Sequence, residues 1–222
     1  MDWSAIALSV RLAAIVSAVL LVIGLPIAYW LTFSSSRWRF VFESIVALPL
    51  VLPPTVLGFY MLVALGSRSP LGRAWQTWTG HGLAFTFEAL VIASILYSLP
   101  FAVQPIAASF AQIDRTLLEA SATLGVGRLR TFQRVVLPLS RDGVLAGAVL
   151  TFAHTIGEFG VVLMIGGAIP GKTEVLSTRI YQLVESLQFG QAHEIAAGLI
   201  IFSFLALFAM LLIERRIGGI RP

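Results

Sequence analysis

The sequence has no cysteine and few charged residues, and both shortages restrict what the chain can be. Without cysteine it cannot form disulfides, thiolate metal sites or a cysteine nucleophile. Charged residues make up only 12% of the chain and hydrophobic residues 58%, with a mean hydropathy of +0.91. Soluble domains carry about 25% charged residues. The composition therefore predicts an integral membrane protein.

Long uncharged runs occur along the whole sequence. Each run can cross a hydrocarbon core of about 30 Å as a helix that rises about 1.5 Å per residue. We expect one all-α membrane domain over residues 1–222, surrounded by lipid. Its five spans are expected at about 8–33, 43–66, 85–111, 142–167 and 195–213.

Residues 172–194 leave two interpretations open. The segment could be a sixth span, but its charged residues would each be costly in lipid. Its apolar residues recur at helical spacing, which favours an amphipathic helix lying along a surface. These apolar residues are Leu176, Ile180, Leu183, Val184 and Leu187.

Basic residues are distributed unevenly between the predicted loops. One side of the predicted topology carries Arg37, Arg39, Arg115, Arg128, Arg130, Arg134, Arg141, Arg215, Arg216 and Arg221. The other side carries Arg68, Arg73, Lys172 and Arg179. Because lysine and arginine concentrate on the cytoplasmic side of the inner membrane, we expect the N-terminus outside and the C-terminus in the cytoplasm. The net charge of +4 follows from this bias, so it does not indicate nucleic-acid binding.

The polar segment 114–141 lies between the third and fourth predicted spans, on the cytoplasmic side. Asp114 is suited to cap a helix that Gly125 ends. A second short helix can follow over 128–136, stopped by Pro138. These signals predict a two-helix elbow that protrudes from the membrane and contacts a partner. The alternative is an ordinary basic loop that only fixes the topology.

The spacing of residues within this elbow resembles the "EAA" loop of ABC-importer permeases. That pattern is Glu-Ala-Ala, three residues, Gly, nine residues, Ile, one residue, Leu-Pro, and the sequence departs from it only at Ser121 and Val135. In that family the loop docks on a separate ATP-binding subunit, and two such subunits drive transport. The resemblance implies that the ATPase-coupling residues are Glu119, Ala120, Ser121, Gly125, Leu137 and Pro138.

Residues 166–173 match the pattern of a phosphate-binding loop, Gly-x-x-x-x-Gly-Lys-Thr. That motif requires a preceding strand inside a soluble α/β domain. Here an apolar helix precedes it, so we expect a turn at the outer end of the fourth span. The histidines are too scattered for a metal site, and no nucleophile, base and acid form a set. We expect neither catalysis by this chain nor a bound cofactor.

Two predicted spans contain residues that are unusual in lipid. The second span contains Pro49, Pro53 and Pro54, which remove backbone donors and break or kink the helix. Such a break serves either packing or the lining of a translocation path.

The fourth span contains Glu158, flanked by Gly157, Phe159 and Gly160. An ionisable residue within a span is a functional candidate. A carboxylate would repel an oxyanion, so we favour a gate or hinge role over direct binding, with Thr155 as a possible hydroxyl partner. A purely structural polar contact is the alternative.

Segment 48–59 resembles the corresponding segment of molybdate permeases, the ModB family, and the run 157–160 is similar to that of permeases for molybdate, tungstate and sulfate. The resemblance implies a type I importer permease that carries molybdate, or also tungstate, into the cell. It also implies a permease homodimer, two ATP-binding subunits and a soluble oxyanion-binding protein on the outer face. A sulfate or thiosulfate permease is the alternative within the same class of protein. Alternatives from other classes are a channel, a secondary carrier and a membrane ATPase that hydrolyses ATP by itself.

Overall fold

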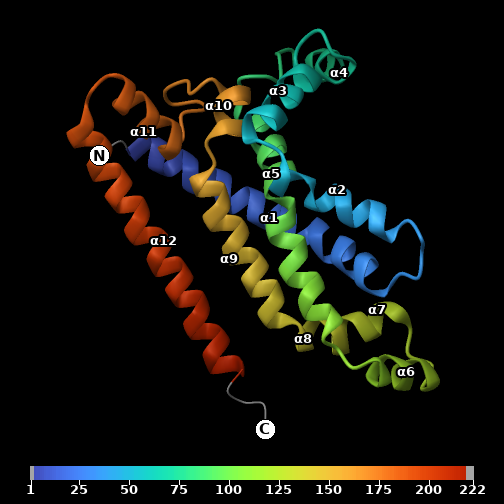
Figure 1. Cartoon of the computed structure of the whole chain (residues 1–222). Helices are drawn as coiled ribbons and strands as arrows, with labels where there is room; N and C mark the ends of the chain where they lie inside the picture. Colours follow the sequence, from blue (N-terminus) through green and yellow to red (C-terminus); the bar gives the residue numbers. More distant parts are fainter. Residues whose placement is uncertain (1–2, 219–222) are drawn as a thin grey trace.

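The computed structural model describes residues 3–218, with side chains as far as residue 212. All regular elements in this part of the chain are helices (Figure 1). Three of them form the centre of the molecule: α1 (Trp3–Phe33), α5 (Phe87–Ala111) and α9 (Arg141–Gly157). The chain thus has the all-α fold that its composition predicts.

Small residues explain how closely these three helices pack. One face of α1 buries Ala5, Ser9, Ala13, Ser17, Gly24 and Ala28. On α9, a Cβ added to Gly143 would lie only 2.3 Å from Ser109 Cβ, and one added to Gly147 only 2.9 Å from the carbonyl oxygen of Ala102. Close approach through small residues is the usual way in which helices associate in a membrane.

Among the described residues, α1, α5 and the apolar part of α12 (Phe189–Gly218) are long and apolar enough to cross a membrane. Two bent helix pairs pass the same test if each is counted as one span. These pairs are Arg39–Val51 with Pro54–Leu65, bent by 111°, and Arg128–Leu139 with Arg141–Gly157, bent by 73°. Three to five spans are therefore available to this multi-pass membrane protein.

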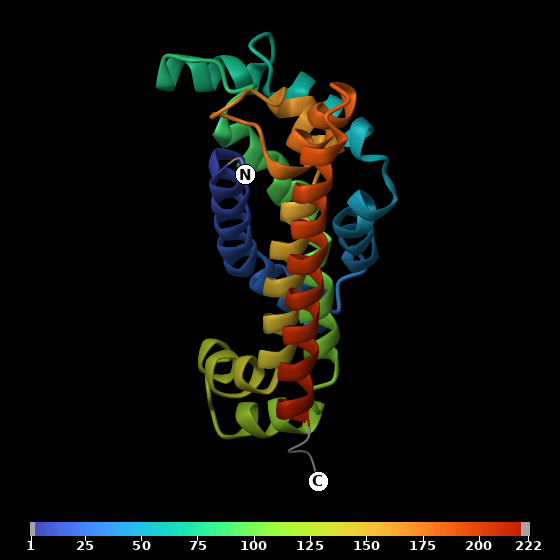
Figure 2. The same cartoon turned by 90° about the vertical axis from the view of Figure 1, so that its left-hand side faces the viewer.

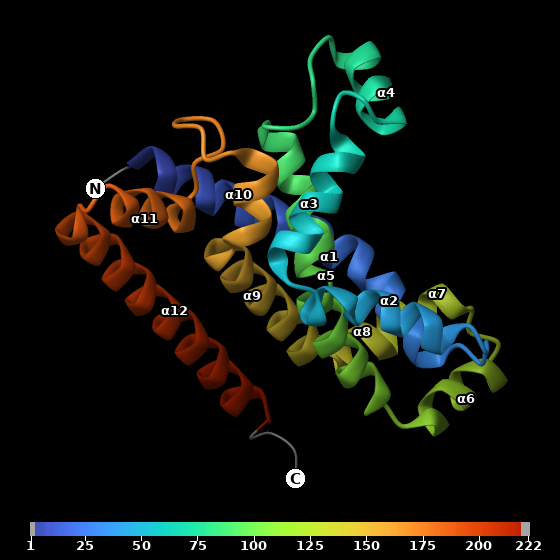
Figure 3. The same cartoon turned by 45° about the horizontal axis from the view of Figure 1, so that its top comes forward.

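The first bent pair consists of α2 (Arg39–Val51) and α3 (Pro54–Leu65). The break falls at Leu52 and Pro53, both with extended backbone, and α3 then begins at a proline. Figure 3 shows the two helices turning away from each other at this point. The predicted proline break is confirmed.

The fourth expected span, 142–167, contains a break, because α9 stops at Gly157 and α10 (Gly160–Gly166) starts a new helix. The last span also differs from its expected start at 195, since α12 begins at Phe189. A helix can extend beyond the hydrocarbon core into water, which an apolar run cannot reveal. Figure 3 shows α12 at the edge of the molecule, and none of its most apolar window is buried.

The polar segment 114–141 forms α6 (Arg115–Thr123), α7 (Arg128–Thr131), a π-helical segment η1 (Phe132–Val136) and α8 (Leu137–Leu139). Asp114 caps α6 by accepting the backbone N–H of Thr116 at 2.9 Å, as expected. Gly125 follows α6 with φ of +70°, a conformation that favours glycine.

The predicted stop of the elbow's second helix at Pro138 is wrong. The helical run that begins at Arg128 continues through Pro138 to Leu139, and the chain turns only at Ser140.

The opposite end of the molecule carries α4 (Pro70–Thr79), α10 and α11 (Leu176–Glu185), as Figure 2 shows. Helix α11 is too short to span and lies across the bundle, so residues 172–194 do not form a sixth span. The segment 166–173 is a turn in which Thr173 Oγ1 donates to the carbonyl oxygen of Gly166 at 2.6 Å. No strand precedes it within the described chain.

Candidate functional site: a buried break and an exposed elbow

The break between α9 and α10 consists of two non-helical residues, Glu158 and Phe159. At Glu158 the backbone is extended, with φ of −59° and ψ of 133°, and its carbonyl group leaves the helical ladder. Ser177 of α11 donates its hydroxyl to this carbonyl oxygen. The freed backbone acceptor is thus satisfied by a helix on the end surface of the molecule, as a break in lipid requires.

The side chain of Glu158 is buried, with only 2% of the residue exposed. Two serines one turn apart on α5 donate to it: Ser94 Oγ lies 2.5 Å from Oε2 and Ser98 Oγ lies 2.7 Å from Oε1. Each carboxyl oxygen therefore has its own hydroxyl donor. A buried polar group is tolerated when its hydrogen bonds are made, and here α5 supplies them.

The neighbouring polar residues join this cluster through Ser98. Thr155, expected as a direct partner of Glu158, instead lies 3.1 Å from Ser98 Oγ. His154 Nδ1 lies 2.9 Å from Ser98 Oγ and 3.6 Å from Glu158 Oε1. The imidazole stacks on Phe101 with ring centroids 3.8 Å apart. His154 is therefore a packed, hydrogen-bonded residue.

The two broken helices meet at their breaks. A Cβ added to Gly160 would lie 2.8 Å from Pro54 Cβ, and one added to Gly58 would lie 2.7 Å from Met164 Cβ. The structure thus brings together Pro54 and Gly160, two of the residues predicted for a path or gate. Pro49 lies within α2, away from this contact.

The remaining residues predicted for the path or gate differ in their surroundings. Pro53 is exposed. A Cβ on Gly157 would meet nothing within 4 Å. Phe159 packs on Tyr181 of α11, with ring centroids 5.1 Å apart. Phe159 and Ser177 therefore connect the break to α11, a contact that sequence reasoning missed.

The predicted ATPase-coupling residues lie at the other end of α9. Helix α6 buries none of its residues, and Glu119 and Ala120 are exposed on it. Ser121 is half-buried and donates its hydroxyl to the carbonyl oxygen of Leu117 at 2.9 Å. Leu137 and Pro138 lie on α8, beside the start of α9. Helix α9, 17 residues and about 25 Å long, separates the elbow from the break.

Exposed apolar side chains on the elbow indicate a protein contact. Leu124 is 81% exposed and Leu129 is 70% exposed, on either side of the bend at Gly125. Within the described residues, no three histidine, aspartate or glutamate side chains gather in a metal-binding group. The elbow thus exposes large apolar side chains on both sides of its bend.

Comparisons with known proteins agree with this arrangement. The family described as "Binding-protein-dependent transport system inner membrane component" matches residues 8–219. The molybdenum transport system permease protein ModB of Azotobacter vinelandii is 50% identical over 209 residues, which cover 94% of this chain and 92% of that protein. ModB of Escherichia coli (strain K12) is 34% identical over 185 residues, 83% of this chain and 81% of that protein.

Solved structures share the fold. A chain of the MetNI methionine ABC transporter in an inward-facing conformation has a TM-score of 0.73 at 18% identity, covering 97% of this chain and 95% of that chain. A chain of a bacterial alginate ABC transporter in complex with an alginate pentasaccharide-bound periplasmic protein has a TM-score of 0.66 at 21% identity, covering 96% and 79%. The chain therefore belongs to the family of binding-protein-dependent transport system inner membrane components and, within it, to the ModB permeases.

Proposed function

We propose that this chain is the transmembrane subunit of an ATP-driven importer that moves molybdate, and also tungstate, into the cytoplasm. The observation that carries the proposal is the 50% identity, over nearly the full length of both chains, to a protein named as a molybdenum transport permease. ATP hydrolysis belongs to a separate subunit, and this chain supplies no catalytic site of its own. A sulfate or thiosulfate permease is the second candidate, favoured by the Gly157–Gly160 run alone.

In this proposal the elbow 114–141 receives the ATP-binding subunit. The exposed carboxylate of Glu119 pairs with a basic group of the partner, and the small Ala120 and Ser121 allow close approach. Gly125 sets the bend between the two short helices, while Leu137 and Pro138 join the elbow to α9. Movement of the elbow is transmitted along α9 as a rigid body, because packed helices switch between discrete arrangements.

The break at the other end of α9 acts as the gate or hinge. Gly157, Glu158 and Phe159 are the points at which the backbone direction changes, and Gly160 packs against Pro54 of the other broken helix. Pro49 and Pro53 allow α2 and α3 to change their relative angle. Glu158 holds the break to α5 and does not contact the transported anion.

Two copies of the chain enclose the path. Apolar side chains of α2 and α3 are exposed and the most apolar window of α12 is unburied, so surface for a symmetric contact is available. The N-terminus lies outside and the C-terminus in the cytoplasm. A soluble oxyanion-binding protein docks on the outer end, over residues 67–84 and 172–194, as the periplasmic protein of the alginate transporter suggests.

The test is uptake into proteoliposomes that contain the permease, its ATP-binding subunit and its binding protein. Labelled molybdate should accumulate only with ATP, and excess tungstate should compete more strongly than excess sulfate. Stronger competition by sulfate would assign the chain to the sulfate class. Uptake without the ATP-binding subunit, or ATP hydrolysis by the purified chain alone, would exclude the importer subunit altogether.

A further inference from the structure

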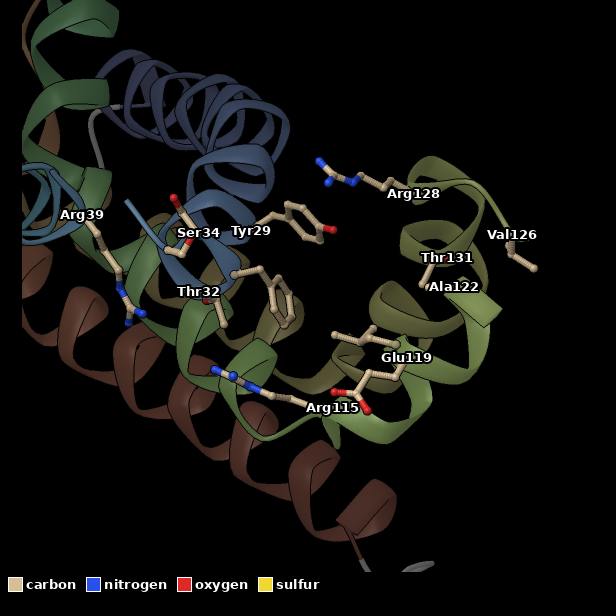
Figure 4. A pocket seen from close by; sticks show the side chains of 13 residues that line it. Tyr29, Thr32, Ser34, Arg39, Arg115, Glu119, Ala122, Val126, Arg128 and Thr131 are labelled. Atoms are coloured by element: carbon tan, nitrogen blue, oxygen red, sulfur yellow. The ribbon is translucent and has the colours of Figure 1, made fainter. Parts of the chain in front are cut away.

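A cavity of about 420 Å³ lies between the end of α1, the start of α2 and the elbow. Three arginines line it, Arg39 from α2 and Arg115 and Arg128 from the elbow, with Glu119 as a single carboxylate. Hydroxyl groups complete the polar wall: Tyr29, Thr32, Ser34, Ser35 and Thr131. Figure 4 shows Arg115 extending from the elbow toward Thr32, and Arg128 extending toward α1. The cavity thus offers charged and neutral donors from three elements.

The positive charge of this cavity is largely uncompensated by the chain itself. In the part of the chain that the structure describes, Arg115 and Arg128 make no ion pair, and Arg39 lies 4.0 Å from Glu43 in an exposed i,i+4 pair. The Nε atom of Arg39 is buried without a hydrogen-bond partner among the described residues. Guanidinium groups are suited to phosphate-type oxyanions, which accept several hydrogen bonds at once.

A second, mostly apolar cavity of about 370 Å³ adjoins the first and shares Thr32 and Arg39 with it. Its apolar wall comes from α1, α2 and α5: Leu31, Val46, Ala47, Val103, Ala107, Ala108 and Ala111. Glu43 and Gln104 also line this cavity. Both cavities lie where the long apolar helix α1 ends and where Trp30 and Trp38 are exposed. Exposed tryptophans at helix ends mark the membrane–water interface.

We propose that the arginine-lined cavity binds a phosphate-type oxyanion, supplied by the head group of an anionic phospholipid. The adjoining apolar cavity provides room for part of an acyl chain, which free phosphate would leave empty. Basic pockets between membrane helices are suited to such head groups. Because the ligand contacts α1 and α2 on one side and the elbow on the other, its binding fixes the elbow relative to the membrane helices.

The experiment is native mass spectrometry of the complete transporter, released from membranes that contain phosphatidylglycerol and phosphatidylcholine. We expect the wild-type complex to retain phosphatidylglycerol preferentially. The double variant Arg115→Gln, Arg128→Gln should lose roughly fivefold in retention for each arginine removed. The matched control, Arg130→Gln with Arg134→Gln, removes the same number of charges from the same elbow. Neither arginine lines the cavity, so the control should behave as wild type.

A parallel titration with inorganic phosphate, without anionic lipid, identifies the source of the anion. If the double variant loses lipid retention and the control does not, the lipid site stands. Saturable phosphate binding that the double variant loses, with lipid retention unchanged, would keep the oxyanion site but overturn its lipid source. Equal lipid and phosphate binding by the double variant and the control would overturn the proposal.

Discussion

At one end of α9 the carboxyl group of Glu158 is buried and accepts hydrogen bonds from Ser94 and Ser98. At the other end the carboxylate of Glu119 is exposed on the elbow, with no hydrogen bond from the described side chains. The first carboxyl group has all its partners within the chain. The second lies on a helix that buries none of its residues. The same residue type therefore has opposite surroundings on the two sides of α9.

This difference distinguishes the break, whose contacts all lie within the chain, from the elbow, whose exposed surface needs a partner. The break is held by α5 through two serines, by α11 through Ser177 and by the contact between Gly160 and Pro54. The elbow packs on α1 and α5 through Leu118, Phe132 and Val136, but α6, which carries Glu119, buries none of its residues. Changes at the break should therefore lower the stability of the isolated permease, whereas changes at the elbow should alter its assembly.

The largest loss of stability is expected when Glu158 loses both of its donors. In the double variant Ser94→Ala, Ser98→Ala, each lost partner leaves a buried polar atom unsatisfied, at a cost of about 1–3 kcal/mol. The control is Ser17→Ala, because Ser17 Oγ is buried without a hydrogen-bond partner among the described residues. In detergent, the double variant should unfold at a much lower temperature than the wild type, and the control should unfold at the wild-type temperature. A similar decrease in the unfolding temperature of both variants would mean that Ser94 and Ser98 contribute packing and not hydrogen bonds.

Overpacking at the contact between the broken helices should have the next largest effect. The added methyl group of Gly160→Ala would lie 2.8 Å from Pro54 Cβ, closer than two carbon atoms can approach. We expect a loss of about 1–3 kcal/mol in the free energy of unfolding, with reduced transport. Gly157→Ala is the matched control, since its methyl group would meet nothing within 4 Å. If Gly157→Ala lowered the free energy of unfolding equally, backbone freedom rather than close packing would explain why both positions need glycine.

The elbow variant Glu119→Gln should change the unfolding free energy by less than about 0.5 kcal/mol, as exposed substitutions usually do. Association with the ATP-binding subunit should weaken by roughly tenfold, equivalent to about 1.4 kcal/mol, because a charge-assisted contact is lost. Pull-down of the ATP-binding subunit and ATP-driven uptake measure this effect. The control is Glu43→Gln, an exposed carboxylate on α2. Normal association by Glu119→Gln would show that Glu119 is not the coupling residue.

Features that depend on neighbouring residues were predictable from the sequence. The proline break in the second span, the Asp114 cap and the turn over 166–173 each follow from backbone chemistry within a few residues. The amphipathic helix within 172–194 follows from the spacing of its apolar residues, as α11 confirms. The family resemblance of the elbow is likewise local, since all its residues lie between 119 and 138.

Features that depend on distant residues were not predictable from one sequence. Ser94 and Ser98 precede Glu158 by 64 and 60 residues, and two serines in an apolar span look like ordinary small residues. Their i,i+4 spacing on one helix face was the available signal. The contact of Ser177 with the break also joins separate helices. The start of α12 at Phe189 was missed because hydropathy locates the hydrocarbon core and not the helix end.

The smallest effect is expected at the start of α6. The backbone N–H of Thr116 donates to Asp114 and holds the pKa of that carboxyl below its usual value. A lowered pKa in the folded state means that the cap stabilises α6 fully above the usual carboxyl pKa and is lost as the pH falls through the lowered one.

At neutral pH, Asp114→Ala should therefore speed hydrogen exchange in α6 alone, whereas Asp114→Asn should keep most of the protection because asparagine also caps helices. Faster exchange that extended into α9 would show that the elbow and the membrane helices unfold together. The break and the elbow would then not be the separately stabilised regions that their contacts indicate.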